Sequence, residues 1–282
     1  MEGQMKMDPL FDVSEKICIV TGGLGQIGGQ FVKALHERGA RVAVWGRHAD
    51  HDKAAAKFDE VGVTFDDRIR LYQVDITNKE TMNNALDDIE SVWGTPDVLV
   101  NNAGIDTQPS APPEVSGPFE QFPEEVFREV VDVNLVGTFL ACQAVGARMR
   151  KAGKPGSIIN IGSIYGMLSP IQDIYAYKKE LTGVPFIKPV AYSAAKSGIY
   201  NLTRYLATYW GKDGIRVNTL TPAGVWRNTQ DATFQKNFCE RMPMGRMSQE
   251  SEYNGSLIFL ASNASSLMTG SNLVVDGGWT AW

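Results

Sequence analysis

The chain has 282 residues, of which 43% are hydrophobic and 21% charged, and its net charge is −5. This length is enough to bury one large core, and the weakly acidic balance argues against nucleic acid or an anionic membrane as a partner. The N-terminus has no apolar signal region and no long apolar run stands out, so we expect a cytoplasmic protein. Cys18, Cys142 and Cys239 are far apart in the sequence, which predicts no disulfide framework and no metal site.

Strands and helices alternate through the first half of the chain. Short apolar runs predict strands at Ile17–Val20, Arg41–Trp45, Ile69–Asp75 and Asp97–Val100. Between them we expect a helix that ends at Gly39, a short helix over 54–60, and a helix with Met82, Leu86, Ile89 and Trp93 on one side. Thr77 and Glu80 have the spacing of a capping box for this last helix.

The alternation resumes after residues 105–122, whose length and proline, serine and glycine content predict a loop at the rim of a site. Pro123 opens a long helix through Met149, and further helices are expected over 191–209, 231–239 and 249–260. Strands are predicted at Ser157–Ile161, Ile215–Leu220 and Asn272–Val275, and residues 167–189 read as an irregular insertion. The chain is therefore predicted to be a single-domain α/β Rossmann fold, a doubly wound seven-stranded parallel sheet with helices on both faces.

The first strand runs into a glycine-rich turn, Val20-Thr-Gly-Gly-Leu-Gly-Gln-Ile-Gly28, which a helix follows. Glycines let the backbone turn sharply and approach a pyrophosphate, and the free N–H groups of the helix start attract its charge. The alternative is a tight connection without a ligand. As a dinucleotide site, this turn would contribute Gly22, Gly25, Gln26, Ile27 and Gly28.

The end of the second strand bears on the choice of dinucleotide. In such folds an acid here binds the 2′-hydroxyl of NAD, whereas an arginine pairs with the 2′-phosphate of NADP. This chain has no acid at this point, and Gly46 leaves room for Arg47. We therefore expect NADP(H) to be preferred, with NAD(H) possible; the alternative is that Arg47 is only solvated.

Two further groups of residues are candidates for the same site. Asn102-Ala103-Gly104 follows the fourth strand, where small residues suit the close approach of a flat ligand, although a plain turn would explain them too. Asn134 is a polar residue among the apolar turns of the long helix. Because a buried amide must satisfy its hydrogen bonds, its role is either structural or functional.

Tyr192 and Lys196 lie four residues apart at the start of a predicted helix, and so on one face of it. A free tyrosine titrates near pH 10, and a nearby ammonium would favour its phenolate. The chain contains a second pair with this spacing, Tyr175 and Lys179. We favour Tyr192 because small residues flank it and a long amphipathic helix follows.

Together these motifs resemble the short-chain dehydrogenase/reductase superfamily, from about Lys16 to Gly278. The resemblance implies that Ser163 binds the substrate oxygen, Tyr192 exchanges its proton, Lys196 holds the nicotinamide ribose and lowers the tyrosine pKa, and Asn134 positions a water for proton relay. It further implies a homotetramer or homodimer. The implied cofactor contacts also include Tyr192 and Lys196 themselves, with Asp75, Ile76, Asn102, Ala103, Gly104, Pro222, Gly224 and Val225. The implied substrate contacts are Ser163, Tyr165, Tyr192 and Trp226.

Three features depart from the usual pattern of this superfamily. Gln26 stands where a glycine is usual, and Gly25 comes one place early. After the sixth strand the chain reads Pro222-Ala-Gly-Val-Trp-Arg227, without the usual threonine that contacts the cofactor. Ser163 and Tyr192 are further apart than usual because residues 167–189 lie between them.

The predicted activity is an NAD(P)(H)-dependent interconversion of a secondary alcohol and a ketone. Tyrosines, lysines, Gln172 and Asp173 in the insertion suggest a carbohydrate or polyol, because sugar sites combine hydrogen-bonding side chains with an aromatic platform. Local stretches around Ser163 and Asp276 resemble superfamily members that act on sugars, including sialic-acid-like sugars. Two alternatives stay open: a 3-oxoacyl thioester reductase, and a non-catalytic dinucleotide-binding sensor or assembly subunit.

Overall fold

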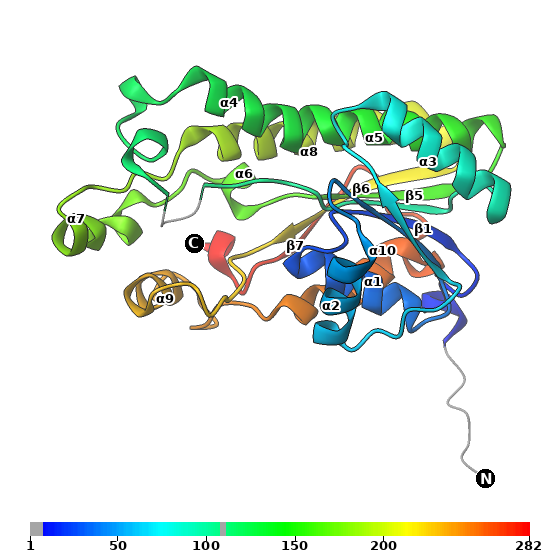
Figure 1. The fold of residues 1–282 in the computed structure, drawn as a ribbon, viewed down its shortest axis with the longest axis horizontal. Coiled ribbons are helices and arrows are strands. Elements are labelled where there is room, and N and C mark those ends of the chain that lie inside the picture. Colours follow the sequence, from blue (N-terminus) through cyan, green and yellow to red (C-terminus); the bar gives the residue numbers. More distant parts are fainter. Residues whose placement is uncertain (1–7, 108–110) are drawn as a thin grey trace, which may run out of the picture.

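Seven short strands pair in one parallel sheet in a computed structural model that describes residues 8–107 and 111–282 (Figure 1). The spatial order is β3-β2-β1-β4-β5-β6-β7. Every residue of β1 and β4 is buried, as expected for strands that helices cover on both faces. The strands are β1 (Ile17–Thr21), β2 (Arg41–Gly46), β3 (Ile69–Gln73), β4 (Val98–Asn101), β5 (Gly156–Ile161), β6 (Ile215–Pro222) and β7 (Asn272–Val275).

Helices cover both faces of the sheet (Figure 1). On one face lie α1 (Gln26–His36), α2 (His51–Val61) and α10 (Asn254–Ala261), and the core there joins Phe31, Phe58 and Leu257. On the other lie α3 (Lys79–Val92), α5 (Gly137–Lys151) and α8 (Val190–Trp210), with Met82 and Met149 in the core. The doubly wound Rossmann fold predicted from the sequence is confirmed.

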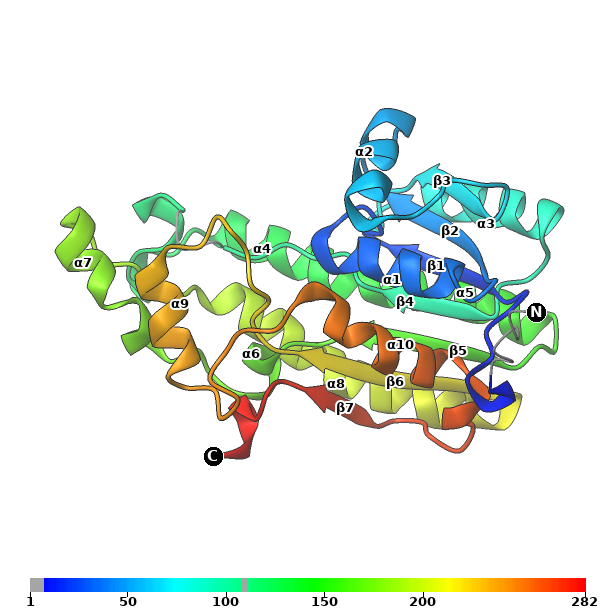
Figure 2. The same ribbon diagram turned by 90° about the horizontal axis from the view of Figure 1, so that it is seen from below.

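The strand order reverses beside β1, which pairs with β2 on one side and with β4 on the other. In open parallel sheets, ligands bind at the carboxyl ends of the strands beside such a reversal. Beyond this edge lie α6 (Ile164–Met167), α7 (Tyr177–Thr182) and α9 (Ala232–Cys239), at one end of the molecule (Figure 2). The fold therefore places the glycine turn and the insertion at the same edge.

The long helix predicted from Pro123 begins as α4 (Glu124–Val131), passes through a π-helical turn at Asp132–Val136, and continues as α5. Among the described residues, the whole helix 124–151 is long and apolar enough to span a membrane by length and composition alone, which the sequence analysis did not single out. It packs along α3 and α8. Its apolar residues therefore belong to the layer that covers the sheet.

The capping box predicted for α3 was wrong. Asn78, not Thr77, caps α3, because its side-chain oxygen accepts a hydrogen bond from the Glu80 N–H at 2.9 Å. Thr77 is engaged elsewhere, since its hydroxyl donates to Asp75 Oδ1 at 2.7 Å.

The insertion 167–189 is not irregular: it contains a 3₁₀ turn at Gln172–Tyr175 and helix α7. Asp231, the N-cap of α9, accepts hydrogen bonds from the Tyr177 hydroxyl at 2.6 Å and from Lys178 Nζ at 2.9 Å. These bonds join the insertion to α9, so the two segments form one structured cover over the carboxyl edge of the sheet.

Candidate active site

The glycine turn between β1 and α1 is closed by tight backbone packing. Gly22 has a φ of +62°, and the Gly25 N–H donates to its carbonyl oxygen at 2.9 Å. A Cβ on Gly28 would overlap that carbonyl oxygen and lie 2.8 Å from Asn102 Nδ2. Gly25 is the N-cap of α1 and caps it with no side chain, so the first N–H groups of the helix face the turn. This cradle fits the pyrophosphate of a dinucleotide.

A cavity of about 360 Å³ extends from this turn across the ends of β2, β3 and β4. Asp75 lies in it with exposed Arg47; although burial opposes the shift, the Thr77 hydrogen bonds and the charge of Arg47 lower the pKa of Asp75. The cavity has the place expected of an adenosine site. The sequence-predicted residues that line it are Gly22, Gly25, Gln26, Ile27, Arg47, Asp75, Ile76, Asn102, Ala103 and Gly104.

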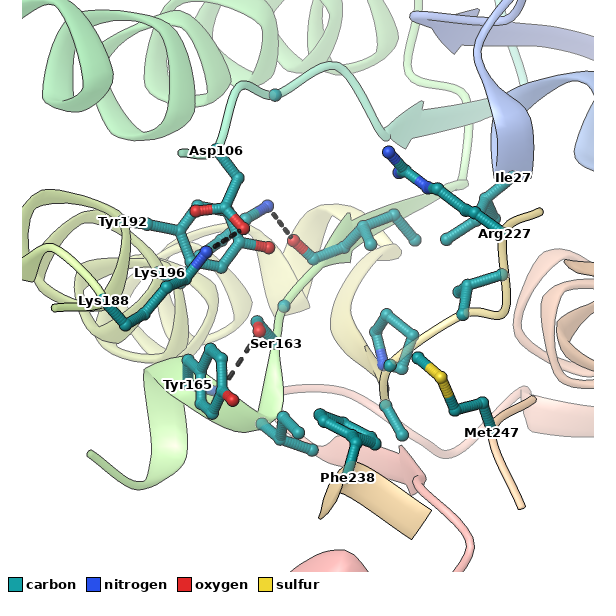
Figure 3. A pocket seen from close by; sticks show the side chains of 18 of the residues that line it. Ile27, Asp106, Ser163, Tyr165, Lys188, Tyr192, Lys196, Arg227, Phe238 and Met247 are labelled. Atoms are coloured by element: carbon teal, nitrogen blue, oxygen red, sulfur yellow. Dashed lines mark hydrogen bonds and ion pairs between the residues drawn. The ribbon is translucent and has the colours of Figure 1, made fainter. Parts of the chain in front are cut away.

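A second cavity, of about 350 Å³, adjoins the first, and its lining includes Lys188 of the insertion and Phe238 of α9 (Figure 3). Both cavities are lined by Ile27, Asn102, Gly104, Ile105 and Arg227, so they form one groove along the carboxyl edge. The sequence-predicted residues that line the second cavity also include Ser163, Tyr165, Tyr192, Lys196, Pro222, Gly224 and Val225.

Ser163, Tyr192 and Lys196 meet in this second cavity (Figure 3). Ser163 follows β5 by two residues and caps α6, and its Oγ accepts a hydrogen bond from the Tyr165 N–H at 3.1 Å. Tyr192 and Lys196 share one face of α8, with Lys196 Nζ 5.8 Å from the centre of the Tyr192 ring. Lys196 is buried and donates to the Ile161 carbonyl oxygen at 2.7 Å. A phenol, an alcohol and an ammonium therefore surround one point of the groove.

Burial dominates the ionisation of this group. It raises the pKa of Tyr192, with a further rise from the charge of Asp106 and an opposing effect from the Ser163 hydroxyl. Burial also lowers the pKa of Lys196 to about 8, against the effect of Asp106. The expected lowering of the tyrosine pKa is therefore not seen in the protein alone, because loss of water around the phenolate outweighs the Ser163 hydrogen bond and the charge of Arg227. Tyr192 holds its proton at neutral pH, the form that a general acid needs.

Asn134 lies in the π-helical turn and is fully buried. Its amide oxygen accepts from the Ile105 N–H at 3.1 Å, and its Nδ2 donates to the Ile105 carbonyl oxygen at 2.8 Å. A side chain on Gly104 would come within 2.5 Å of the Asn134 amide oxygen and 3.8 Å of Lys196 Nζ. Asn134 therefore fixes the wall of the groove beside Lys196, and a water relay through it stays a prediction.

Some predicted residues lie outside the groove. Trp226 is 43% exposed and is not among the described residues that line either cavity. Gly28 likewise lines neither, and serves by leaving space for the turn. The alternative pair does not form: the Tyr175 hydroxyl lies 3.3 Å from that of Tyr165, and Lys179 is exposed.

Gln26, at one of the departures from the usual pattern, links the glycine turn to the loop after β6. Its Nε2 donates to the Trp226 carbonyl oxygen at 2.8 Å, and Arg227 Nε donates to its Oε1. This bridge holds the Arg227 guanidinium at the junction of the two cavities. The sequence analysis missed Arg227 as a lining residue, because only the fold brings it beside Gln26.

Asp106 and Lys188 line the second cavity and were also missed. Two features of the sequence could have pointed to them. Asp106 directly follows Asn102-Ala-Gly-Ile, and Lys188 comes four residues before Tyr192. Aromatic residues also line this cavity: Tyr175 packs on Phe234 with ring centres 5.7 Å apart, and Phe238 is part of the same lining.

A Rossmann sheet with a phosphate cradle, joined to a buried tyrosine, lysine and serine, defines a dinucleotide-dependent oxidoreductase. The family model described as enoyl-(acyl carrier protein) reductase matches residues 24–280. The chain belongs to the short-chain dehydrogenase/reductase family, as the motifs predicted.

Three known proteins illustrate the similarity. Trans-4-hydroxycyclohexanecarboxylate dehydrogenase of Sinomonas cyclohexanicum is 33% identical over 274 residues, which cover 95% of this chain and 94% of that protein. A short-chain dehydrogenase structure from Leptospira borgpetersenii with bound NAD⁺ is 33% identical, covers 99% of both chains and has a TM-score of 0.81. A gluconate 5-dehydrogenase structure from Burkholderia cenocepacia with NADP and tartrate is 30% identical, covers 97% of this chain and 98% of that one, and has a TM-score of 0.80.

Proposed function

We propose that this enzyme interconverts a secondary alcohol and a ketone on a carbohydrate or polyol. The observation that carries the proposal is the meeting of Ser163, Tyr192 and Lys196 in a cavity that continues into the dinucleotide groove. Similar proteins act on hydroxylated compounds, a hydroxycyclohexanecarboxylate and gluconate. When bound, the dinucleotide gives or accepts the hydride.

The side chains of the protein move the proton. In the direction of reduction, the Ser163 hydroxyl donates a hydrogen bond to the substrate carbonyl oxygen, and the protonated Tyr192 hydroxyl gives its proton to that oxygen. The Lys196 ammonium stabilises the phenolate that results. In the direction of oxidation, the same phenolate removes the proton of the substrate hydroxyl. The high pKa of Tyr192 suits its role as the acid.

We further propose NADP(H) as the preferred dinucleotide, with NAD(H) possible. Arg47 is exposed at the rim of the adenosine cavity, after Gly46, and no acid ends β2. A guanidinium in this place can pair with a 2′-phosphate. Structurally similar proteins bind either NAD⁺ or NADP, so the preference follows from Arg47 alone.

A 3-oxoacyl thioester reductase is the second candidate activity. The matching family model is described as enoyl-(acyl carrier protein) reductase, a name that refers to acyl thioesters, and the aromatic residues Tyr175, Phe234 and Phe238 offer apolar contacts to an acyl chain. A non-catalytic sensor is less well supported, since Asn134, Ser163, Tyr192 and Lys196 are all present and the last three meet in one cavity.

A homotetramer or homodimer is proposed from an exposed aromatic face on α5 and α8. Phe139, Tyr205 and Tyr209 are 41%, 63% and 55% exposed and line a hollow of about 650 Å³. An apolar patch of this kind marks a protein interface. The two C-terminal tryptophans differ in exposure: Trp279 is buried against Phe238, and Trp282 is 76% exposed.

The experiment is oxidation of NADPH and NADH with ketoses, keto-sugars and acetoacetyl thioesters, by the wild type and by Tyr192→Phe. We expect turnover of a hydroxylated ketone and a loss of about 100-fold to 10,000-fold in kcat in the variant, because a positioned general acid contributes that much. Dinucleotide binding should persist, because the glycine turn and Lys196 are intact. Turnover that survives the substitution would refute the mechanism, and binding without turnover would favour the sensor.

A further inference from the structure

The substrate cavity contains an ion pair that the proton chemistry does not use (Figure 3). Lys188 Nζ lies 2.6 Å from Asp106 Oδ2 and 2.7 Å from the Thr107 carbonyl oxygen, and Lys188 is only 5% exposed. Gln172 fixes the backbone of Lys188 through bonds of 2.9 Å to its N–H and 3.1 Å to its carbonyl oxygen. The pair is thus a rigid part of the cavity wall.

One oxygen of the Asp106 carboxylate has no donor within residues 8–107 and 111–282. Asp106 Oδ1 is buried and finds no hydrogen-bond partner among the described residues. Lys188 uses two of its three N–H groups on Asp106 and Thr107, which leaves one for a ligand. The Asp106 side chain is 28% exposed and lines the cavity. A carboxylate with a donor on one oxygen alone is costly, so this position favours a ligand that brings an O–H group.

The pair lies beside the reacting groups. Lys188 Nζ is 5.7 Å from the centre of the Tyr192 ring, and Lys196 Nζ is 5.8 Å from the same centre. The charge of Asp106 shifts the pKa of both Tyr192 and Lys196. A ligand group that contacts Asp106 is therefore close to the substrate carbonyl, whose oxygen binds to Tyr192 and Ser163.

We propose that Asp106 and Lys188 form a subsite for a hydroxyl group next to the substrate carbonyl. The Asp106 carboxylate accepts the hydrogen of this hydroxyl, and the remaining Lys188 N–H donates to its oxygen. A ketone or 3-oxoacyl thioester without such a hydroxyl leaves the subsite unpaired, and sites built to bind a hydroxyl reject analogues that lack it. The subsite rests on the proposed function and narrows its substrate to hydroxylated ketones.

The test removes the pair without leaving a lone buried charge. In Asp106→Leu/Lys188→Met, apolar side chains of similar volume replace both ions, a change that proteins tolerate well. The substrates are dihydroxyacetone, erythrulose and fructose, with butanone and acetoacetyl thioester as hydroxyl-free comparators. We expect the wild type to favour at least one ketose over butanone by roughly a hundredfold in kcat/KM, and the double variant to lose that ratio, whatever change the loss of the Asp106 charge makes to the rate with butanone.

Lys178→Met is the matched control. Lys178 lies in the same insertion as Lys188 and pairs with Asp231, the N-cap of α9, at 2.9 Å. Lys178 is not among the described residues that line the cavity. If this control loses the ketose preference as well, the effect comes from a loosened insertion and the subsite is refuted. The subsite is also refuted if the wild type reduces butanone or the thioester as well as any ketose, or if the double variant loses both substrate classes equally. Absence of turnover with every compound would instead refute the proposed function.

Discussion

Replacing Lys196 with methionine should abolish turnover and yet stabilise the protein at neutral pH. Burial lowers the pKa of Lys196 from its ordinary value of 10.5 to about 8, so holding the ammonium in the folded protein costs about 3 kcal/mol at pH 7. Methionine keeps the apolar stem but loses the hydrogen bond to the Ile161 carbonyl oxygen, which costs about 1 to 2 kcal/mol. The net gain is about 1 to 2 kcal/mol.

The predicted difference in stability between Lys196→Met and the wild type depends on pH. Between the folded pKa of about 8 and the unfolded value of 10.5, the unfolded chain holds the Lys196 proton and the folded protein releases it. The stability of the wild type therefore rises with pH through this window relative to Lys196→Met. The advantage of the variant is full near pH 7, shrinks above about pH 8 and disappears between about pH 9 and pH 10, where the remaining cost of the ammonium falls below that of the lost hydrogen bond. Above this range the wild type is the more stable protein.

Thermal unfolding of both proteins across this pH range is the assay. For a chain of this size, a gain of 1 kcal/mol corresponds to roughly 2 to 4 °C in Tm. We expect the variant to melt higher at neutral pH, with a difference that shrinks as the pH rises. A variant that melts lower at neutral pH, by an amount that does not change with pH, would refute the account of Lys196 as a buried ammonium kept for catalysis.

Two further substitutions test the dinucleotide groove by binding measurements. Gly28→Ala should weaken dinucleotide binding by roughly a hundredfold or more and lower Tm, because its Cβ would overlap the Gly22 carbonyl oxygen; an unchanged Kd in fluorescence titration would contradict the cradle. Arg47→Ala should weaken NADPH about tenfold and leave NADH unchanged, as expected for loss of one exposed phosphate contact; tighter binding of NADH by the wild type, or equal losses for both dinucleotides, would contradict the NADP(H) preference.

Features within one short stretch could be predicted from the sequence. The turn Gly22 to Gly28 and the pair Tyr192 and Lys196 each lie in a segment whose local pattern is enough to place them at a helix start. The strands were readable because each is a short apolar run between turn residues. The cap of α3 was misread because Thr77 and Asn78 are adjacent candidates, and the structure shows that Asp75 engages Thr77.

Contacts between distant segments could not be predicted in this way. Asp106 and Lys188 are 82 residues apart, and Gln26 and Arg227 are 201 residues apart. Each pair forms because the parallel sheet brings loops from separate strands to one edge. The order found within the insertion has a similar cause, since Tyr177 and Lys178 need Asp231 of α9 as their partner.

The most direct test of the mechanism is a crystal structure with a bound dinucleotide and a ketose. The account predicts the ketose carbonyl oxygen within hydrogen-bond distance of both the Tyr192 hydroxyl and the Ser163 hydroxyl, in the cavity that Lys196 also lines. A substrate bound elsewhere, a Tyr192 side chain turned away from it, or Tyr175 in its place would contradict the account.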